Sequence, residues 1–303
     1  MLMKILIAGA TGLIGRELVR QCEDEGIEVH YLTTSRGKLN SLHYGEGFYW
    51  DPRNGEIDID AFHEVTAVVN LAGASVSKKW TKSYKDVILS SRVETARLIH
   101  KTLSSINHKV SQYISASGIS VYPSSTEKMY TEDEPTISTS FLGHVVKEWE
   151  KEADAFKDLD IGVAKVRTGI VLSEEEGALP KLVQPIKMGF GAALGSGRQW
   201  QSWIHISDMA GIYLFLLKNN LTGVFNGVSP SPNTQLKVTQ LIASQLNKSL
   251  WLPKVPAFML KLLLGEMSDL VLESQLVSAE KLEEAGYPFQ FVNLENALSD
   301  LSD

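Results

Sequence analysis

The sequence predicts an α/β fold built on a doubly wound parallel sheet with helices on both faces, accompanied by a smaller C-terminal lobe. Short runs rich in Val, Ile and Ala alternate with longer amphipathic segments, as happens when crossover helices bury parallel strands on both faces. A glycine-rich turn directly follows the first of these runs. The chain has 303 residues, more than one compact core usually holds, so a second, smaller unit is expected.

Six segments are predicted as strands because each is short, unbroken and rich in apolar residues. They are residues 4–8, 28–33, 67–71, 112–115, 162–167 and 223–226. A first helix is predicted to begin near Leu13. A later helix is predicted over Leu142 to Phe156, where apolar residues recur with helical spacing. Such a stripe is expected to pack on the sheet.

The composition and pattern of the sequence change after Arg167, where glycines become frequent and loops are predicted in place of the repeated β-α units. Residues 1–167 are therefore predicted to form a Rossmann domain, to which residues 204–228 return. Residues 168–203 and 229–303 are assigned to a C-terminal substrate lobe. From Trp251 onward this lobe is expected to be a helical extension.

The composition restricts the classes of partner. Hydrophobic residues make up 44% and charged residues 21%, as in folded globular proteins. The net charge is −7 and the basic residues are scattered, so no nucleic acid partner is expected. The run from Phe258 to Leu264 is far shorter than the roughly 20 residues that span a bilayer, so no membrane partner is expected either.

Two further features bear on compartment and metals. The chain starts almost directly with a predicted strand, without the regions of a signal peptide, and its one cysteine, Cys22, has no disulfide partner. We therefore expect a cytoplasmic protein in which Cys22 is a buried, inert thiol. His and Cys show no ligand spacing, so no metal is expected. The sequence leaves the oligomeric state open.

The glycine turn has the pattern Gly9-x-x-Gly12-x-x-Gly15 and lies between a buried strand and a helix. This context distinguishes a dinucleotide fingerprint from a chance triplet of glycines. Gly9 permits the tight turn, Gly12 lets the backbone approach a pyrophosphate, and Gly15 permits close packing of helix on strand. Thr11 adds a hydroxyl donor. The sequence therefore predicts pyrophosphate binding at this helix N-terminus.

The end of the second strand indicates which dinucleotide is bound. An NAD enzyme usually places Asp or Glu there to hold the ribose 2′-hydroxyl. This chain instead reads Leu32-Thr33-Thr34-Ser35-Arg36-Gly37-Lys38, whose hydroxyls and cations suit a 2′-phosphate. NADP is favoured over NAD, with a merely solvated turn as the alternative.

With this loop, Asn70-Leu71-Ala72-Gly73 and Ser115-Ala116-Ser117 complete a set of motifs that resembles extended short-chain dehydrogenases/reductases. More narrowly, the chain resembles the uncharacterised "epimerase family protein" branch along essentially its whole length. The motifs that carry this likeness include Trp50-Asp51-Pro52, Ser91-Arg92, residues 166–172, 195–200 and 202–208, Val255-Pro256-Ala257-Phe258, and residues 281–298. The resemblance implies a Rossmann domain with a C-terminal substrate lobe.

The resemblance also implies positions for the cofactor. The residues implied to hold the pyrophosphate are Gly9, Thr11, Gly12, Leu13, Ile14 and Gly15. Ser35 and Arg36 would face the 2′-phosphate, although many relatives carry Arg at the position of Thr34. Leu71, Ala72 and Gly73 would line the adenosine half.

Catalysis in this superfamily uses Tyr-x-x-x-Lys on the helix after the fifth strand, where the Tyr moves the proton that accompanies hydride transfer. Here that helix reads Phe141-Leu142-Gly143-His144-Val145-Val146-Lys147-Glu148-Trp149-Glu150 and has no tyrosine. Either Leu142 and Val146 or Gly143 and Lys147 occupy the positions of the pair. Ser117 fits the serine that hydrogen-bonds a substrate carbonyl. Tyr122 is the nearest candidate for the lost phenol, with simple packing as the alternative.

Four residues are predicted to bind substrate. Arg167 ends a buried strand, at the sheet edge where such folds bind ligands, and suits a carboxylate or phosphate. Arg198, Trp200 and Trp203 follow a glycine-rich loop and are predicted to wall a pocket, with packing between lobe and domain as the alternative. His205 is predicted to be structural, with Asp208 capping the next helix.

Two functions remain open on these grounds. The first is an NADP-dependent oxidoreductase or epimerase/dehydratase-like enzyme acting on a small or sugar-like carbonyl or alcohol. The second is a non-catalytic protein that senses or binds NADP(H) and has lost the Tyr-x-x-x-Lys pair. A carbonyl panel with NADPH separates them, because only the enzyme consumes the reduced cofactor.

Overall fold

A computed structural model describes residues 3–302 and has an eight-stranded sheet at its centre, in the order β12-β8-β6-β5-β1-β2-β3-β4. The strands of this sheet are β1 (Lys4–Ala8), β2 (Glu28–Thr33), β3 (Glu46–Asp51), β4 (Glu56–Ile57), β5 (Ala67–Asn70), β6 (Gln112–Gly118), β8 (Gly162–Thr168) and β12 (Gly223–Gly227). Neighbours run parallel except β3 and β4. All six predicted strands are present, and the predicted parallel sheet is confirmed.

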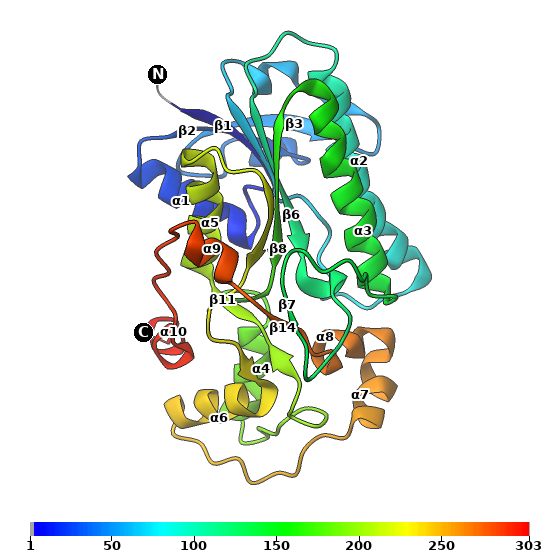
Figure 1. Ribbon diagram of the computed structural model, residues 1–303, viewed down its shortest axis with the longest axis vertical. Coiled ribbons are helices and arrows are strands. Elements are labelled where there is room, and N and C mark those ends of the chain that lie inside the picture. Colours follow the sequence, from blue (N-terminus) through cyan, green and yellow to red (C-terminus); the bar gives the residue numbers. More distant parts are fainter. Residues whose placement is uncertain (1–2, 303) are drawn as a thin grey trace.

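Helices cover both faces of the sheet (Figure 1). These helices are α1 (Leu13–Asp24), α2 (Lys82–Leu103), α3 (Phe141–Asp154) and α5 (Ile206–Lys218). On β1, Ile5 and Ile7 join the apolar core under α1 and α5, whereas Leu6 and Ala8 join the core under α2 and α3. Because side chains alternate along a strand, apolar residues at every position bury both faces.

Strand β3 was not predicted. It pairs with β2 in parallel, and its buried residues Phe48 and Trp50 alternate with less buried neighbours. The period of two is visible in the sequence, but the residues that alternate with Phe48 and Trp50 are polar or glycine. The strand therefore lacks the continuous apolar character of the central strands.

Short elements form the lobe below the sheet (Figure 1). The strand pairs are β7 (Met129–Tyr130) with β14 (Leu276–Val277), β9 (Ile170–Leu172) with β11 (Trp203–His205), and β10 (Trp200–Gln201) with β13 (Asn233–Thr234). The helices are α4 (Leu179–Lys187), α6 (Gln235–Gln245), α7 (Ala257–Leu264), α8 (Asp269–Leu272) and α10 (Leu294–Asp300). Helix α9 (Glu280–Glu284) instead lies beside α5, where Leu282 joins the core of the sheet (Figure 1). Side chains of α4, α6 and α10 share one apolar cluster.

Asp208 on α5 ties the C-terminal segment to the Rossmann domain. Its buried carboxylate accepts the N–H groups of Gln290 and Phe291 and the hydroxyl of Tyr287. The prediction that Asp208 caps α5 is wrong, because the cap is His205, whose Nδ1 accepts the N–H of Ser207 at 3.2 Å. Asp208 lies in the first turn of α5, where its carboxylate meets the returning chain instead.

Cys22 is buried on α1, and burial raises the pKa of its thiol to about 12. This environment suits the inert thiol that the sequence predicts. The apolar run from Phe258 to Leu264 forms most of α7, where Leu262 and Leu263 are largely exposed. Within residues 3–302, no helix combines the length and apolar character that crossing a bilayer requires.

Candidate functional site

The glycine loop between β1 and α1 has three glycines with different roles. Gly9 has φ +87°, and a Cβ there would lie 2.8 Å from the carbonyl carbon of Leu71. A Cβ on Gly15 would come within 2.3 Å of the Gly9 carbonyl oxygen. Gly12 is exposed, and its Cβ would meet only the Gly9 oxygen, at 3.3 Å. Gly9 and Gly15 are therefore required by the turn itself, whereas Gly12 keeps its outer surface open.

The backbone N–H groups at the N-terminus of α1 receive no side-chain cap from the described residues. Gly12 occupies the cap position, and no side chain of residues 3–302 caps the helix there. By contrast, Thr81, Ser140 and Thr234 cap α2, α3 and α6. Free N–H groups and the positive end of a helix dipole form a site for an anion such as a pyrophosphate. The glycine cradle and the open helix end together fit a dinucleotide.

A cation lies at the end of β2. Ser35 and Arg36 are both exposed, and the Arg36 guanidinium stacks over the ring of Tyr49 on β3, 3.9 Å from its centroid. Residues 33–38 contain no carboxylate that would neutralise it. The unpredicted strand β3 thus orients a side chain that the sequence places at the 2′-phosphate.

The segment after β5 borders the glycine loop. A Cβ on Gly9 would contact both Leu71 and Ala72, and the Leu71 N–H donates to the carbonyl of Ala8 at 2.8 Å. Gly73 follows and faces the side chain of Arg92 on α2. The structure therefore brings the two predicted cofactor segments side by side.

A second cluster surrounds Ser117 at the carboxyl end of β6. The Ser117 hydroxyl donates to Oε1 of Glu150 on α3 at 2.6 Å. Arg167 on β8 donates to the same carboxylate through Nε at 2.9 Å and Nη2 at 3.0 Å. Burial alone lowers the pKa of Arg167, but the hydrogen bonds and charge of Glu150 outweigh it and raise that pKa. Because the Ser117 hydroxyl donates its hydrogen bond to Glu150, its oxygen lone pairs remain free to accept a hydrogen bond from another group.

Tyr122 belongs to this cluster but is fully buried. Its hydroxyl donates to Oδ1 of Asn226 at 2.7 Å and accepts from Nη1 of Arg167 at 2.9 Å. Burial raises the pKa of Tyr122 to about 12, although Arg167 opposes the shift. The Tyr122 hydroxyl therefore already donates one hydrogen bond and accepts another inside the protein. This arrangement favours a packing role for Tyr122 over a role in proton transfer.

Helix α3 shows which residues occupy the positions of the missing catalytic pair. Val146 is buried and would lie 3.5 Å from a Cβ on Gly118, beside Ser117. Lys147 points to the exposed face of the helix. The register with Leu142 and Val146 is therefore the one that faces β6.

Glu150, Asn226 and Glu132 also belong to the cluster, although the sequence did not predict them as site residues. The buried Asn226 joins Tyr122, and its backbone N–H donates to the Glu132 carboxylate at 2.8 Å. Burial raises the pKa of Glu132. A signal for Glu150 was present, because it lies within the apolar stripe of α3 and a carboxylate there needs a cation.

The predicted substrate residues are dispersed. Arg167 is paired with Glu150, so its charge is already neutralised. Arg198 is exposed, and Trp200 donates through Nε1 to the carbonyl of Thr126 at 3.1 Å. Trp203 is buried in the lobe core and donates to the carbonyl of Ser231 at 2.8 Å, which fits the packing alternative.

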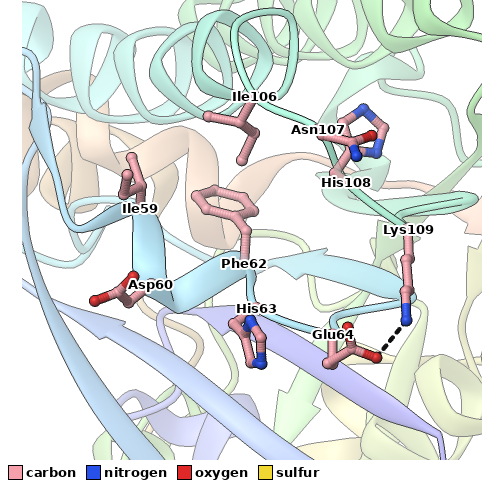
Figure 2. A pocket seen from close by; sticks show the side chains of 9 residues that line it. All are labelled: Ile59, Asp60, Phe62, His63, Glu64, Ile106, Asn107, His108 and Lys109. Carbon is pink, nitrogen blue, oxygen red and sulfur yellow. Dashed lines mark hydrogen bonds and ion pairs between the residues drawn. The ribbon is translucent and has the colours of Figure 1, made fainter.

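A pocket of about 290 Å³ lies at the opposite edge of the sheet, where β5 and β6 begin. Figure 2 shows Glu64 and Lys109 directed at one another on one side of the pocket, while Ile106 points toward the ring of Phe62. The glycine loop instead follows the end of β1, so this pocket is separate from the cofactor residues. Among residues 3–302, His, Cys, Asp and Glu form no cluster of three or more that could hold a metal ion.

Comparisons with known proteins agree with this geometry. The model of the NAD dependent epimerase/dehydratase family matches residues 5–227, and that of a domain of unknown function (DUF1731) matches residues 255–301. The chain is 35% identical to the epimerase family protein SH2119 of Staphylococcus haemolyticus over 308 residues, covering 99% of each.

Two solved structures are also similar to the whole chain. The human epimerase family protein SDR39U1, solved with NADPH, superposes with a TM-score of 0.86 at 29% identity over 99% of each chain. The nucleoside-diphosphate sugar epimerase of Corynebacterium glutamicum superposes with a TM-score of 0.79 at 26% identity, over 99% of this chain and 58% of that one.

Proposed function

Because this chain belongs to the NAD dependent epimerase/dehydratase family, we propose that it binds NADP(H) and exchanges a hydride with a small or sugar-like carbonyl or alcohol. The observation that carries this proposal is the open glycine loop, whose helix N-terminus presents unpaired amides to an anion. The human relative was solved with NADPH, which supports binding of that cofactor. The Corynebacterium relative is a nucleoside-diphosphate sugar epimerase, which supports a sugar-like substrate.

The preference for NADP over NAD rests on Arg36. Its guanidinium is exposed, stacked on Tyr49 and free of any carboxylate partner within residues 3–302. A guanidinium can grip a phosphate with two parallel hydrogen bonds, which the 2′-hydroxyl of NAD does not offer.

Replacing Arg36 with alanine should therefore raise the Kd for NADPH by about 10- to 100-fold and leave the Kd for NADH within about twofold, since a hydrogen bond to a charged group is worth roughly 1.5–3 kcal/mol. Calorimetric titration of both cofactors measures this. Arg53→Ala, in the nearby turn between β3 and β4, controls for the loss of one exposed positive charge. Tighter binding of NADH than NADPH by the unaltered protein would reverse the cofactor assignment.

Ser117 and Glu150 provide a route for the proton. A bound nicotinamide supplies the hydride donor or acceptor. When an alcohol is oxidised, its hydroxyl proton passes to Ser117 as the Ser117 proton passes to Glu150; reduction of a carbonyl reverses both transfers. We propose this path in place of the Tyr-x-x-x-Lys pair, because Val146 occupies the lysine position and Tyr122 is buried.

The test is consumption of NADPH with a panel of aldehydes, ketones and sugar-like carbonyls, followed by the absorbance of the reduced nicotinamide. Ser117→Ala should lower kcat by about 100-fold, a typical contribution of positioned proton transfer, with the Kd for NADPH unchanged. Ser111→Ala is the control, because Ser111 immediately precedes β6 at the end opposite Ser117, and this variant should retain full activity.

The rival function is a non-catalytic NADP(H) sensor, and one observation favours it: the helix that should carry the catalytic pair presents only Leu142 and Val146. Tight NADPH binding with no consumption across the panel would establish the sensor and exclude the enzyme.

We further propose that the protein acts in the cytoplasm on small molecules, without nucleic acid or membrane partners. The net charge of −7 with scattered basic residues supports the absence of a nucleic acid partner. Fractionation of cells that express the tagged full chain tests the compartment.

A further inference from the structure

Arg92 on α2 is a half-buried cation without a counterion among residues 3–302. Its guanidinium lies over the ring of Trp149 on α3, 4.9 Å from the centroid. Within residues 3–302 no carboxylate pairs with it, although the chain carries 36 acidic residues. Burial lowers the pKa of Arg92 to about 10. A charge held in this way is costly unless something compensates it.

Most of its hydrogen-bonding capacity is unused. Nη1 donates to the carbonyls of Ala74 at 3.2 Å and Ile88 at 2.9 Å, which occupies two of five N–H groups. Nε and both hydrogens of Nη2 have no partner among the described residues. Arg92 is only half-buried, so its side chain is not sealed from solvent. Three donors of a fixed cationic fork therefore remain available to a ligand.

The position of Arg92 links the two clusters described above. A Cβ on Gly73 would lie 3.0 Å from the guanidinium carbon, and Gly73 continues the segment that touches Gly9 of the phosphate loop. On the other side, Trp149 follows Val146 by one helical turn, and Val146 borders Gly118 next to Ser117. Arg92 thus lies between the glycine loop and Ser117.

We propose that Arg92 binds phosphate oxygens of a ligand held between the glycine loop and Ser117, with its free fork supplying charge-assisted hydrogen bonds. The inference rests on the proposed function, because it assumes a phosphate-bearing ligand between the loop and Ser117. Two sources carry this chemistry: the pyrophosphate of the dinucleotide and the diphosphate of a nucleotide-sugar substrate. Carbonyl groups of Ala74 and Ile88 and the ring of Trp149 hold the fork in place for either one.

The test compares Arg92→Met, which keeps an unbranched side chain against Trp149, with Arg92→Lys, which keeps the charge. Arg97→Met is the matched control, because Arg97 lies on the same helix with 62% of its side chain exposed. Calorimetry gives the Kd of NADPH for each full-length protein, and of uridine diphosphate for each protein saturated with NADPH. The unfolding temperature of the ligand-free proteins is the second measurement.

If the dinucleotide is the source, Arg92→Met should raise the Kd for NADPH by about 10- to 100-fold, as expected for lost hydrogen bonds to a charged group, and Arg92→Lys should lose less. If the substrate is the source, only the affinity for uridine diphosphate should fall. In both cases ligand-free Arg92→Met should unfold at the same or a higher temperature, because it removes an uncompensated charge.

A purely structural Arg92 gives a different pattern: a lower unfolding temperature for ligand-free Arg92→Met with both Kd values unchanged. That result overturns the inference and leaves the proposed function standing. Failure of the unaltered protein to bind NADPH overturns the proposed function, and the inference about Arg92 falls with it.

Discussion

Replacing Gly12 with alanine is expected to weaken NADPH binding by about 100-fold, or about 2.8 kcal/mol, while the free protein keeps its fold. The Gly12 backbone has φ −84°, which alanine adopts without strain, and a Cβ would contact only the Gly9 oxygen at 3.3 Å. The new methyl group would instead occupy the surface where a pyrophosphate approaches the amides of α1. Calorimetry measures the affinity, and urea unfolding should show a stability change below about 1 kcal/mol.

Gly15→Ala makes the same chemical change three residues later and serves as the contrast. Its Cβ would come within 2.3 Å of the Gly9 carbonyl oxygen, so the turn itself must move. We expect this variant to lose stability even without ligand, by several times the loss in Gly12→Ala. A folded Gly12→Ala protein that binds NADPH as tightly as the unaltered one would show that the pyrophosphate is not held at this loop.

The central sheet was predictable because each of its inner strands is marked by a contiguous run of residues in the sequence. Strands such as β1 and β5 are buried on both faces, so nearly every residue is apolar and the run stands out. The paired strands of the lobe have only two or three residues each, too few to display a period. Strand β3 lies near the edge of the sheet, where only one face is fully covered, so half of its residues are polar.

The two halves of the site differ in the same way. The glycine loop is contiguous, and its spacing alone indicates the backbone geometry that the structure shows. The Ser117 cluster joins residues far apart in the chain, and its carboxylate, Glu150, has no motif. One regularity along β8 was informative, because Lys165 and Arg167 alternate in period two and thus face the same helix, where they meet Asp154 and Glu150.

Arg167→Met is expected to destabilise the protein by about 3–5 kcal/mol, because removing one partner of a buried pair leaves the other charge uncompensated. Arg167 and Glu150 are among the least exposed ion-paired side chains, at 9% and 12%. After the substitution, the carboxylate would keep the Ser117 hydroxyl at 2.6 Å and Lys165 at 4.0 Å, which cannot replace a two-pronged guanidinium. The free energy of unfolding in urea measures the loss.

Arg97→Met is the matched control, because Arg97 also grips a carboxylate of α3, that of Glu152, through two hydrogen bonds. Since Arg97 is largely exposed, solvent compensates both charges after the change, and the loss should stay below about 1 kcal/mol. Adding Glu150→Gln to Arg167→Met should restore part of the stability, because the uncompensated charge is then gone. Equal losses for the two arginine variants would mean that water reaches Glu150, and Ser117 would then have no shielded carboxylate to receive its proton.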